Sequence, residues 1–377
     1  MTKRKAVVIF SGYNQRALIA FLRYATEHGL KFYIIASSEE DPILMSKYGQ
    51  YVFSIRTHKA FSPEIILPIL VKLKEEKNLD ELVILPSSEY LNRAVLASRE
   101  EFLEEGISIP LVGESIYQKI SDKYAFRDLC DKSGLTVPKV YENTDVLVPP
   151  YVLKPRKYFS PDGAVQFKPQ LILTQDQHLR FVDEHTSDDF YIEEFVQGRS
   201  FYLLFYISRD GSVISYSQEN LIQQADGGSM IVACSANLHD SELSDRYSKL
   251  LVDIGFHGLI MIELRKSDSE VYMIEANPRL WGPSQLFVDS KVPLFSRFLG
   301  DLEFELPSIE SPDSVKPALY FWSGGMGATG LGNSNLVYHG TSPERMKADL
   351  HSFAQYDIYN RPDTLPIYEL ENTHNQR

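Results

Sequence analysis

Two short apolar segments joined by a polar turn carry acidic residues at positions where buried strands usually carry none. The segments are Leu259–Leu264 and Glu270–Ala276, and they contain Glu263 and Glu275. Folding them as a hairpin pairs these two acids, and strand alternation turns Asn277 to the same side as Glu275. Two carboxylates and an amide oxygen on one patch are hard ligands of the kind that Mg²⁺ prefers.

The competing interpretation of this hairpin is a solvated face, on which acidic residues are common. The residues around the two acids are strongly apolar, however. An acid embedded in such strands needs a partner, and neighbouring like charges are unfavourable without a cation. We therefore predict a divalent metal site formed by Glu263, Glu275 and Asn277, with Arg279 at the end of the same strand.

The N-terminal part alternates short apolar runs with amphipathic stretches. This order is typical of a parallel α/β layer, which we expect to span residues 1–113. It is not a dinucleotide-binding unit, because Ser11-Gly-Tyr-Asn14 after the first strand lacks the glycine pattern of that motif. The expected strands are 6–10, 31–36, 51–55 and 81–86, and the expected helices are 16–28 and 63–77.

The rest of the chain changes texture. Residues 115–134 predict two helices, with Ser121 and Asp122 as N-cap candidates for the second. Strands separated by turns are expected from 151 to 232, followed by a helix over 240–254, the acidic hairpin and two short helices. After Glu305 the pattern weakens, and the glycine-rich stretch 323–332 predicts a loop. We expect a small lobe over 114–190, a large lobe over 191–305 and an extension over 306–377.

Composition excludes several classes of protein. The net charge is −13, so the chain has no general attraction for nucleic acid or anionic membranes. Two cysteines cannot build a disulfide framework, and no segment approaches the length of a membrane span. We expect a cytoplasmic protein with no nucleic-acid or membrane partner, and a homo-oligomer is compatible with the sequence.

The string Glu275-Ala-Asn-Pro-Arg-Leu-Trp-Gly282 resembles the acidic motif of the ATP-grasp superfamily, in the form found in carboxylate–amine ligases. The resemblance extends over about half of the chain, from Ser115 to Gly300. It implies an α/β pre-ATP-grasp domain followed by a two-lobed α+β ATP-grasp module.

Two lysines match lysine positions of the superfamily. Lys123 follows Ser121-Asp122 at the start of a helix, and Lys154 lies in Tyr151-Val-Leu-Lys-Pro155 at the end of a strand. The resemblance implies that both contact nucleotide phosphates, for which a flexible ammonium is a suitable point charge. Either lysine alone would more simply be a solvent-exposed charge.

The adenine and ribose contacts are implied in the same way. Glu193 should face the adenine amino group, and the backbones of Glu194 and Val196 should contact the ring edge. A second acid usually binds the ribose hydroxyls, but this chain has Arg199-Ser200 there, so that only Ser200 could contribute a hydrogen bond. In the loop after Lys154, Ser160 and Gly163 could present backbone N–H groups to phosphate.

The resemblance implies a ligase that uses ATP and Mg²⁺, with Mn²⁺ as a substitute. A carboxylate would attack the γ-phosphate, and an amine would then displace phosphate from the acyl phosphate; amino acids are candidates for both substrates. Arg279 would hold the transferred phosphoryl group, because a guanidinium binds oxyanions in a bidentate manner. An ATP-grasp kinase and a non-catalytic nucleotide-binding regulator are the alternatives.

Two further segments could contact substrates. Residues 86–90 follow the fourth expected strand, where Ser88 is also a candidate helix N-cap. The amide-rich stretch 218–229 is nearly free of charge, which favours an acceptor that is not highly anionic.

Overall fold

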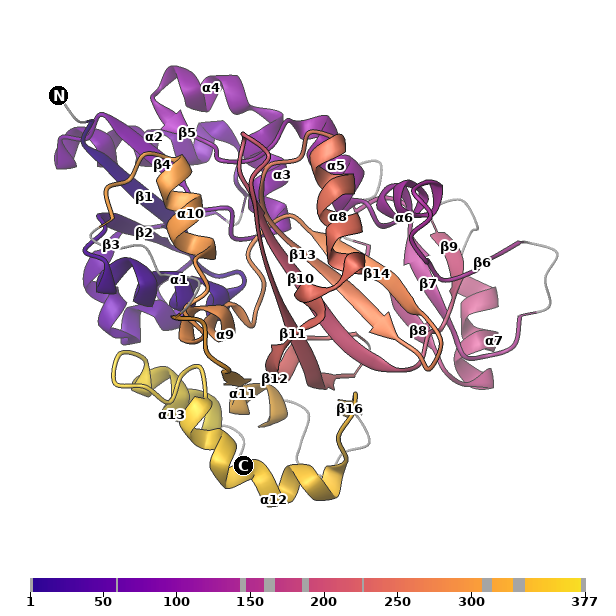
Figure 1. Cartoon of the computed structure of the whole chain (residues 1–377). Helices are drawn as coiled ribbons and strands as arrows, with labels where there is room; N and C mark the ends of the chain where they lie inside the picture. The colour runs from indigo at the N-terminus through magenta and orange to yellow at the C-terminus, as the bar shows by residue number, and fades with distance from the viewer. Residues whose placement is uncertain are drawn as a thin grey trace.

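The computed structural model describes residues 3–58, 60–142, 147–158, 167–184, 190–225, 227–306, 314–327 and 336–373. These residues form three β-sheets flanked by helices (Figure 1). None of the helices in these ranges is long and apolar enough to cross a membrane.

The first sheet is the predicted parallel α/β layer. Its five strands lie in the order β3-β2-β1-β4-β5, with Val7 opposite both Phe32 and Val83. The order reverses between β1 and β4, so the loops that follow these two strands meet at one edge of the sheet. The elements are β1 (Lys5–Phe10), α1 (Gln15–Glu27), β2 (Phe32–Ala36), β3 (Val52–Ile55), α2 (Pro63–Lys77), β4 (Glu81–Ile84), α3 (Glu89–Ala97), α4 (Arg99–Glu104) and β5 (Ile107–Ser108).

Two helices connect this layer to a small antiparallel sheet with the order β6-β9-β7-β8. Asp122 stands at the N-cap of α6, but neither it nor Ser121 caps the helix, because both side chains accept hydrogen bonds from Arg93. The expectation of strands alone from residue 151 to 232 was also wrong, since helix α7 interrupts them. The elements are α5 (Glu114–Ser121), α6 (Lys123–Lys132), β6 (Val140–Tyr141), β7 (Tyr151–Pro155), β8 (Gln170–Ile172), α7 (Gln175–Glu184) and β9 (Phe190–Glu194).

The largest sheet has seven strands, six of them in the order β14-β13-β10-β11-β12-β15, with β16 paired to β11. Both predicted hairpins are present in it. Its elements are β10 (Arg199–Ile207), β11 (Val213–Gln224), β12 (Met230–Ala236), α8 (Glu242–Asp253), β13 (Gly258–Lys266), β14 (Val271–Asn277), α9 (Ser284–Asp289) and α10 (Leu294–Asp301).

The C-terminal extension belongs to this sheet as well. Its strands β15 (Leu319–Phe321) and β16 (Leu336–Tyr338) are antiparallel to β12 and β11. The expected loop over 323–332 is helical at its start, in α11 (Ser323–Gly327), and residues 328–335 lie outside the described ranges. The chain continues through α12 (Pro343–Phe353) and α13 (Leu365–Thr373). Short 3₁₀ turns occupy Pro42–Met45, Lys47–Tyr51, Leu238–Asp240 and Ala354–Tyr356.

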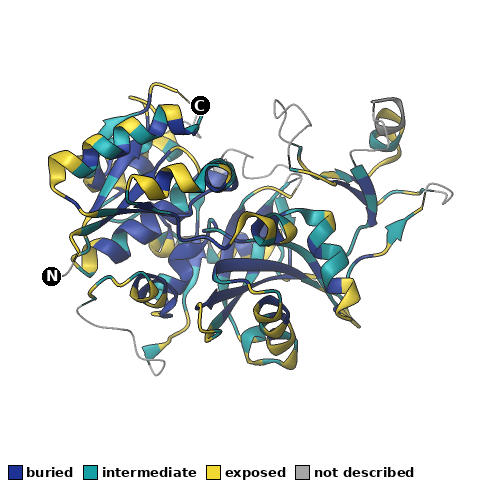
Figure 2. Ribbon diagram, turned by 90° about the horizontal axis from the view of Figure 1, so that it is seen from above, coloured by how far each residue is buried: buried dark blue, intermediate teal, exposed yellow. Residues whose placement is uncertain are grey.

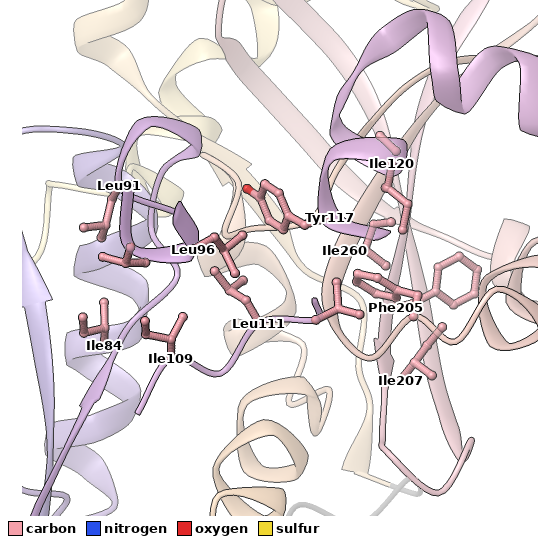
Figure 3. Packing of buried hydrophobic residues seen from close by; sticks show 14 of the residues in the cluster. Ile84, Leu91, Leu96, Ile109, Leu111, Tyr117, Ile120, Phe205, Ile207 and Ile260 are labelled. Carbon is pink, nitrogen blue, oxygen red and sulfur yellow. The ribbon is translucent and has the colours of Figure 1, made fainter. Parts of the chain in front are cut away.

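The two faces of the large sheet pack into two different hydrophobic cores, as the alternating residues of β10 show. Leu203, Phe205 and Ile207 point into a core shared with α5 and the first layer (Figure 3). Leu204 and Tyr206 point to the other face, into a second core with α1, α9 and α10. Buried residues lie on strands of all three sheets and on helices such as α1 (Figure 2).

Candidate active site

The second face of the large sheet is apolar at one end and polar at the other. Glu263 stands directly opposite Glu275 on β14 and opposite Tyr202 on β10, as the hairpin prediction required for the two acids. Directly opposed residues of antiparallel strands have Cβ atoms about 4.5–5.5 Å apart. The polar end thus places two carboxylates and a tyrosine side by side.

A β-bulge follows this pair. Glu263 pairs with Glu275 but Leu264 pairs with Met273, so Ile274 is the extra residue on β14. A bulged residue is left out of the ladder, which frees its backbone groups for other partners. The carbonyl oxygen of Ile274 accepts a hydrogen bond of 2.8 Å from the ammonium of Lys154 on β7. The bulge thus connects the small sheet to the large sheet beside Glu275.

Lys154 has a second partner within the small sheet. Its ammonium lies 2.7 Å from Oε1 of Glu193 on β9, and both side chains are buried. The other carboxylate oxygen of Glu193 is buried and has no hydrogen-bond partner among the described residues. Lys154 therefore neutralises Glu193 in addition to standing where a phosphate contact was predicted.

Glu275 is bound on both oxygens. Lys123, the first residue of α6, forms a close ion pair with Oε2, and the Asn277 amide donates to Oε1 at 2.8 Å. Burial alone would raise the pKa of Glu275, but the charge of Lys123 and these hydrogen bonds hold it well below the usual range. Lys123, which is predicted to contact nucleotide phosphate, therefore lies against the predicted metal ligand Glu275.

Glu263 shows the opposite shift. Burial raises its pKa, and the neighbouring Glu275 raises it further, against the attraction of Arg265. The Arg265 guanidinium donates to Oε1 of Glu263 at 3.1 Å. A divalent cation between the two carboxylates would oppose both the burial and the repulsion that raise the pKa of Glu263.

The donor set fits a hard divalent ion. Glu263 and Glu275 are paired across β13 and β14, as predicted, and Asn277 lies two residues after Glu275 on β14. No group of three or more His, Cys, Asp or Glu side chains that could hold a metal occurs in the described ranges, so the predicted ligands of this site are two carboxylates and an amide. Two carboxylates with an amide oxygen and water suit Mg²⁺ better than the nitrogen and sulfur ligands of Zn²⁺ would.

Arg279 differs from the other cations of the site. Its guanidinium donates to Oδ1 of Asn277 at 3.0 Å and to the carbonyl of Leu280 at 2.8 Å. Its Nε is buried without a hydrogen-bond partner among the described residues. Lys123, Lys154 and Arg265 each pair with a carboxylate. Arg279 thus retains charge and a donor for an anionic ligand.

Helix α3 of the first layer supplies further groups. Ser88 caps it, accepting from the Leu91 N–H at 3.2 Å, which confirms the N-cap interpretation of this segment. The buried carboxylate of Glu89 accepts from Arg93 at 2.7 Å and from the Tyr117 hydroxyl at 2.8 Å. The charges of Glu89 and Arg279 both act on Tyr117. This cluster therefore lies against the end of the acidic motif.

The loop after β1 connects the first layer to the segment that follows Arg279. The Asn14 amide donates to the carbonyls of Ser87 and Leu280, at 3.1 and 2.8 Å, and the Leu280 N–H donates to Pro86 at 3.1 Å. Residues 11–14 and 86–90 thus border the segment that follows Arg279, as expected for loops at the order reversal of the parallel sheet. A substrate contact by them remains a prediction.

Two tyrosines of the site were not found by sequence reasoning. Burial raises the pKa of Tyr158 to about 12, with Glu89 adding to the effect, and Arg93 lies over its ring, 5.1 Å from the centroid. Tyr202 is buried beside Glu263, and both its burial and the charge of Glu263 raise its pKa. The pairing of β10 with β13 would have revealed Tyr202, but it joins strands that are distant in sequence.

Some of the groups that were predicted to contact the nucleotide already form hydrogen bonds within the protein. Ser200 is fully buried, and its hydroxyl accepts from Asn220 at 3.0 Å across the β10–β11 pair, so a ribose contact has no support here. The Glu194 N–H is already bonded to the Lys139 carbonyl at 2.9 Å, which leaves only its carbonyl for a base. Val196 lies in the irregular link between β9 and β10. Ser160 and Gly163 lie outside the described residues.

No protein-family model and no curated protein matches the sequence. Solved structures do resemble it. A biotin carboxylase from Campylobacter jejuni, in a β,γ-ATP complex, is 17% identical with a TM-score of 0.60, over 84% of this chain and 75% of that one. An L-amino acid ligase from Bacillus licheniformis is 16% identical with a TM-score of 0.59, over 85% and 80%.

The N5-carboxyaminoimidazole ribonucleotide synthetase from Thermotoga maritima is 18% identical with a TM-score of 0.54, covering 84% of this chain and 79% of that one. All three have the fold of ATP-grasp proteins. At these identities the likeness establishes the fold. The chain therefore has the ATP-grasp fold that its acidic motif indicated.

Proposed function

We propose that this protein is an ATP-dependent, ADP-forming ligase that joins a carboxylic acid to an amine through an acyl phosphate. The observation that carries the proposal is the pairing of Glu263 with Glu275 on β13 and β14, beside the Lys154 bridge between the two lobes. ATP-grasp enzymes of similar fold, among them an amino acid ligase, support the same reaction class.

In this proposal the acidic pair and Asn277 hold Mg²⁺, which supplies positive charge to the phosphate oxygens when it is bound. Lys154 and Lys123 exchange part of their carboxylate contacts for phosphate oxygens. Glu193 accepts a hydrogen bond from the adenine amino group through its unpaired oxygen. Arg279 binds the transferred phosphoryl group through the donors that its protein contacts leave free.

The chemistry needs no covalent protein nucleophile. A carboxylate oxygen of the acid attacks the γ-phosphorus, and the bond from this phosphorus to the ADP oxygen breaks. The amine nitrogen then attacks the acyl carbon, the acyl–phosphate bond breaks, and the nitrogen loses its proton as phosphate leaves. The protein contributes positioning and charge stabilisation.

ADP release measured over an array of acid and amine pairs, beginning with amino acids, tests the proposal. We expect Mg²⁺-dependent ADP formation that requires both substrates and yields an amide. ADP formation with an acid-derived or alcohol-derived phosphate as the stable product would identify a kinase. Nucleotide binding without turnover across the array would contradict a ligase and favour a regulatory role.

A further inference from the structure

His339 connects the C-terminal extension to the polar end of the large sheet. It directly follows β16, which pairs with residues 222–224 of β11, and its N–H donates to the Leu221 carbonyl at 2.8 Å. The residue is 7% exposed. A backbone fixed by strand pairing thus delivers an imidazole into a buried polar environment.

The hydrogen bonds of this imidazole have a defined direction. The Arg265 guanidinium lies 2.8 Å from Nδ1 and 3.1 Å from Nε2, and Nε2 also lies 3.0 Å from Oε1 of Gln223. Arginine can only donate, so Nδ1 accepts and the proton resides on Nε2. The Gln223 amide nitrogen is engaged with the Gly228 carbonyl at 2.9 Å, which leaves its oxygen to accept from His339.

This arrangement requires a neutral imidazole. Burial and the adjacent Arg265 charge lower the pKa of His339 to about 3, so the ring is neutral under physiological conditions. A protonated ring would place two donors against the guanidinium. A neutral ring with its proton on Nε2 therefore suits both Arg265 and Gln223.

The other end of Arg265 reaches the metal-ligand pair. The same guanidinium that contacts His339 donates to Oε1 of Glu263 at 3.1 Å, and its side chain is 12% exposed. A continuous chain of hydrogen bonds thus runs from Gly228 through Gln223, His339 and Arg265 to Glu263. The arginine and the histidine are 74 residues apart in sequence.

We infer that His339 is a positioning residue that fixes the Arg265 guanidinium and, through it, orients the Glu263 carboxylate toward Glu275. The C-terminal extension is then part of the support of the metal site. Arginine has many rotamers, and its fork geometry is useful only when it is held in place. Outer partners of metal ligands typically contribute 10–100-fold in metal affinity. The inference rests on the proposed function for the identity of the ion.

Three variants separate positioning from general stability. His339→Ala removes the acceptor for Arg265, whereas His339→Gln offers an acceptor and a donor on one side chain. Met346→Ala is the matched control, because Met346 is buried in α12 against the apolar cluster of the extension and lies outside the hydrogen-bond chain. The measurements are Mn²⁺ affinity in the presence of ADP, ADP affinity in a chelator, and the melting temperature of the metal-free protein.

We expect His339→Ala to weaken Mn²⁺ binding about 10–100-fold while ADP affinity in the chelator changes little. His339→Gln should recover most of the loss, and Met346→Ala should lower the melting temperature with Mn²⁺ affinity retained. Unchanged Mn²⁺ affinity in His339→Ala, or an equal loss of Mn²⁺ affinity in Met346→Ala, would overturn this inference but not the proposed function. If the wild-type protein with ADP binds no Mn²⁺, the metal assignment of the proposed function fails and the inference with it.

Discussion

The ammonium of Lys154, on the small sheet, donates to the carbonyl of Ile274, on the large sheet, at 2.8 Å. Ile274 can accept because the bulge in β14 leaves it out of the ladder next to Glu275. The same ammonium binds Glu193. One lysine therefore contacts both the residue proposed to bind adenine and the strand that carries Glu275.

Replacing Lys154 should expose two separate roles. Lys154→Met leaves the Glu193 carboxylate buried without its cation, and breaking one side of such a pair costs about 3–5 kcal/mol of folding free energy. Lys154→Met combined with Glu193→Gln removes both charges and should recover most of that loss. Nucleotide binding should remain impaired in both variants, because neither supplies a phosphate contact.

Urea denaturation measures the folding free energy of each variant, and calorimetry measures its ATP affinity. If the double variant binds ATP as tightly as the wild type, Lys154 acts only as the partner of Glu193. If stability falls equally in both variants, the buried pair is not the source of the effect.

The local parts of this architecture could be predicted from sequence. Apolar runs with turn residues predicted four of the five strands of the first layer and both hairpins, since each depends on neighbours in sequence. The hairpin prediction placed Glu263 opposite Glu275, but this register depends on the bulge at Ile274. The pairs nearer the turn, continued without the bulge, would place Glu263 opposite Ile274. The bulge itself was not predicted, and its contact is long-range, because the Ile274 carbonyl accepts from Lys154 of another sheet.

The long-range contacts could not be predicted. The residues around Ser200 do not indicate that it is buried against Asn220. The contact of Arg265 with His339 depends on where β16 joins the sheet. That strand has three residues, too few for a recognisable alternation. The weak pattern after Glu305 therefore concealed an extension that pairs with β11 and β12.

Glu275→Ala should abolish ADP formation while changing the melting temperature of the metal-free protein by only a few degrees. Relief of the repulsion between Glu275 and Glu263 offsets part of the loss of the Lys123 ion pair, and both partners of that pair are partly exposed. The matched control is Glu270→Ala, at the exposed turn of the same hairpin, which should retain activity. Normal turnover of Glu275→Ala would show that the metal assignment is incorrect.

The protein should use ATP in preference to GTP. The unpaired oxygen of Glu193 can accept from the adenine amino group, whereas guanine presents a carbonyl at that position and leaves both acceptors unpaired. Sites built around such a hydrogen bond discriminate by about 10⁴ in kcat/KM. Glu193→Gln offers an amide donor to the guanine carbonyl and should narrow the difference in kcat/KM between ATP and GTP. Equal kcat/KM for the two nucleotides in the wild type would refute this role of Glu193.

Arg279 should act on the chemical step more than on ATP binding. If it holds the phosphoryl group in transfer, Arg279→Ala should lower kcat by about 10²–10³, the usual cost of one charged donor to a developing oxyanion. The ATP dissociation constant should change little, because the lysines remain. Arg279→Lys should recover only part of the rate, since an ammonium lacks the bidentate geometry.

A purely structural role for Arg279 predicts a different pattern. The guanidinium braces Asn277 and the Leu280 carbonyl, rather than Glu263 or Glu275. Were bracing its only role, Arg279→Ala would displace Asn277, lower the melting temperature and weaken metal and ATP binding together. Calorimetry of nucleotide affinity beside single-turnover phosphate release distinguishes the two. Lost affinity with an unchanged chemical step would exclude Arg279 from the transfer, because a group that binds the moving phosphoryl must affect its rate.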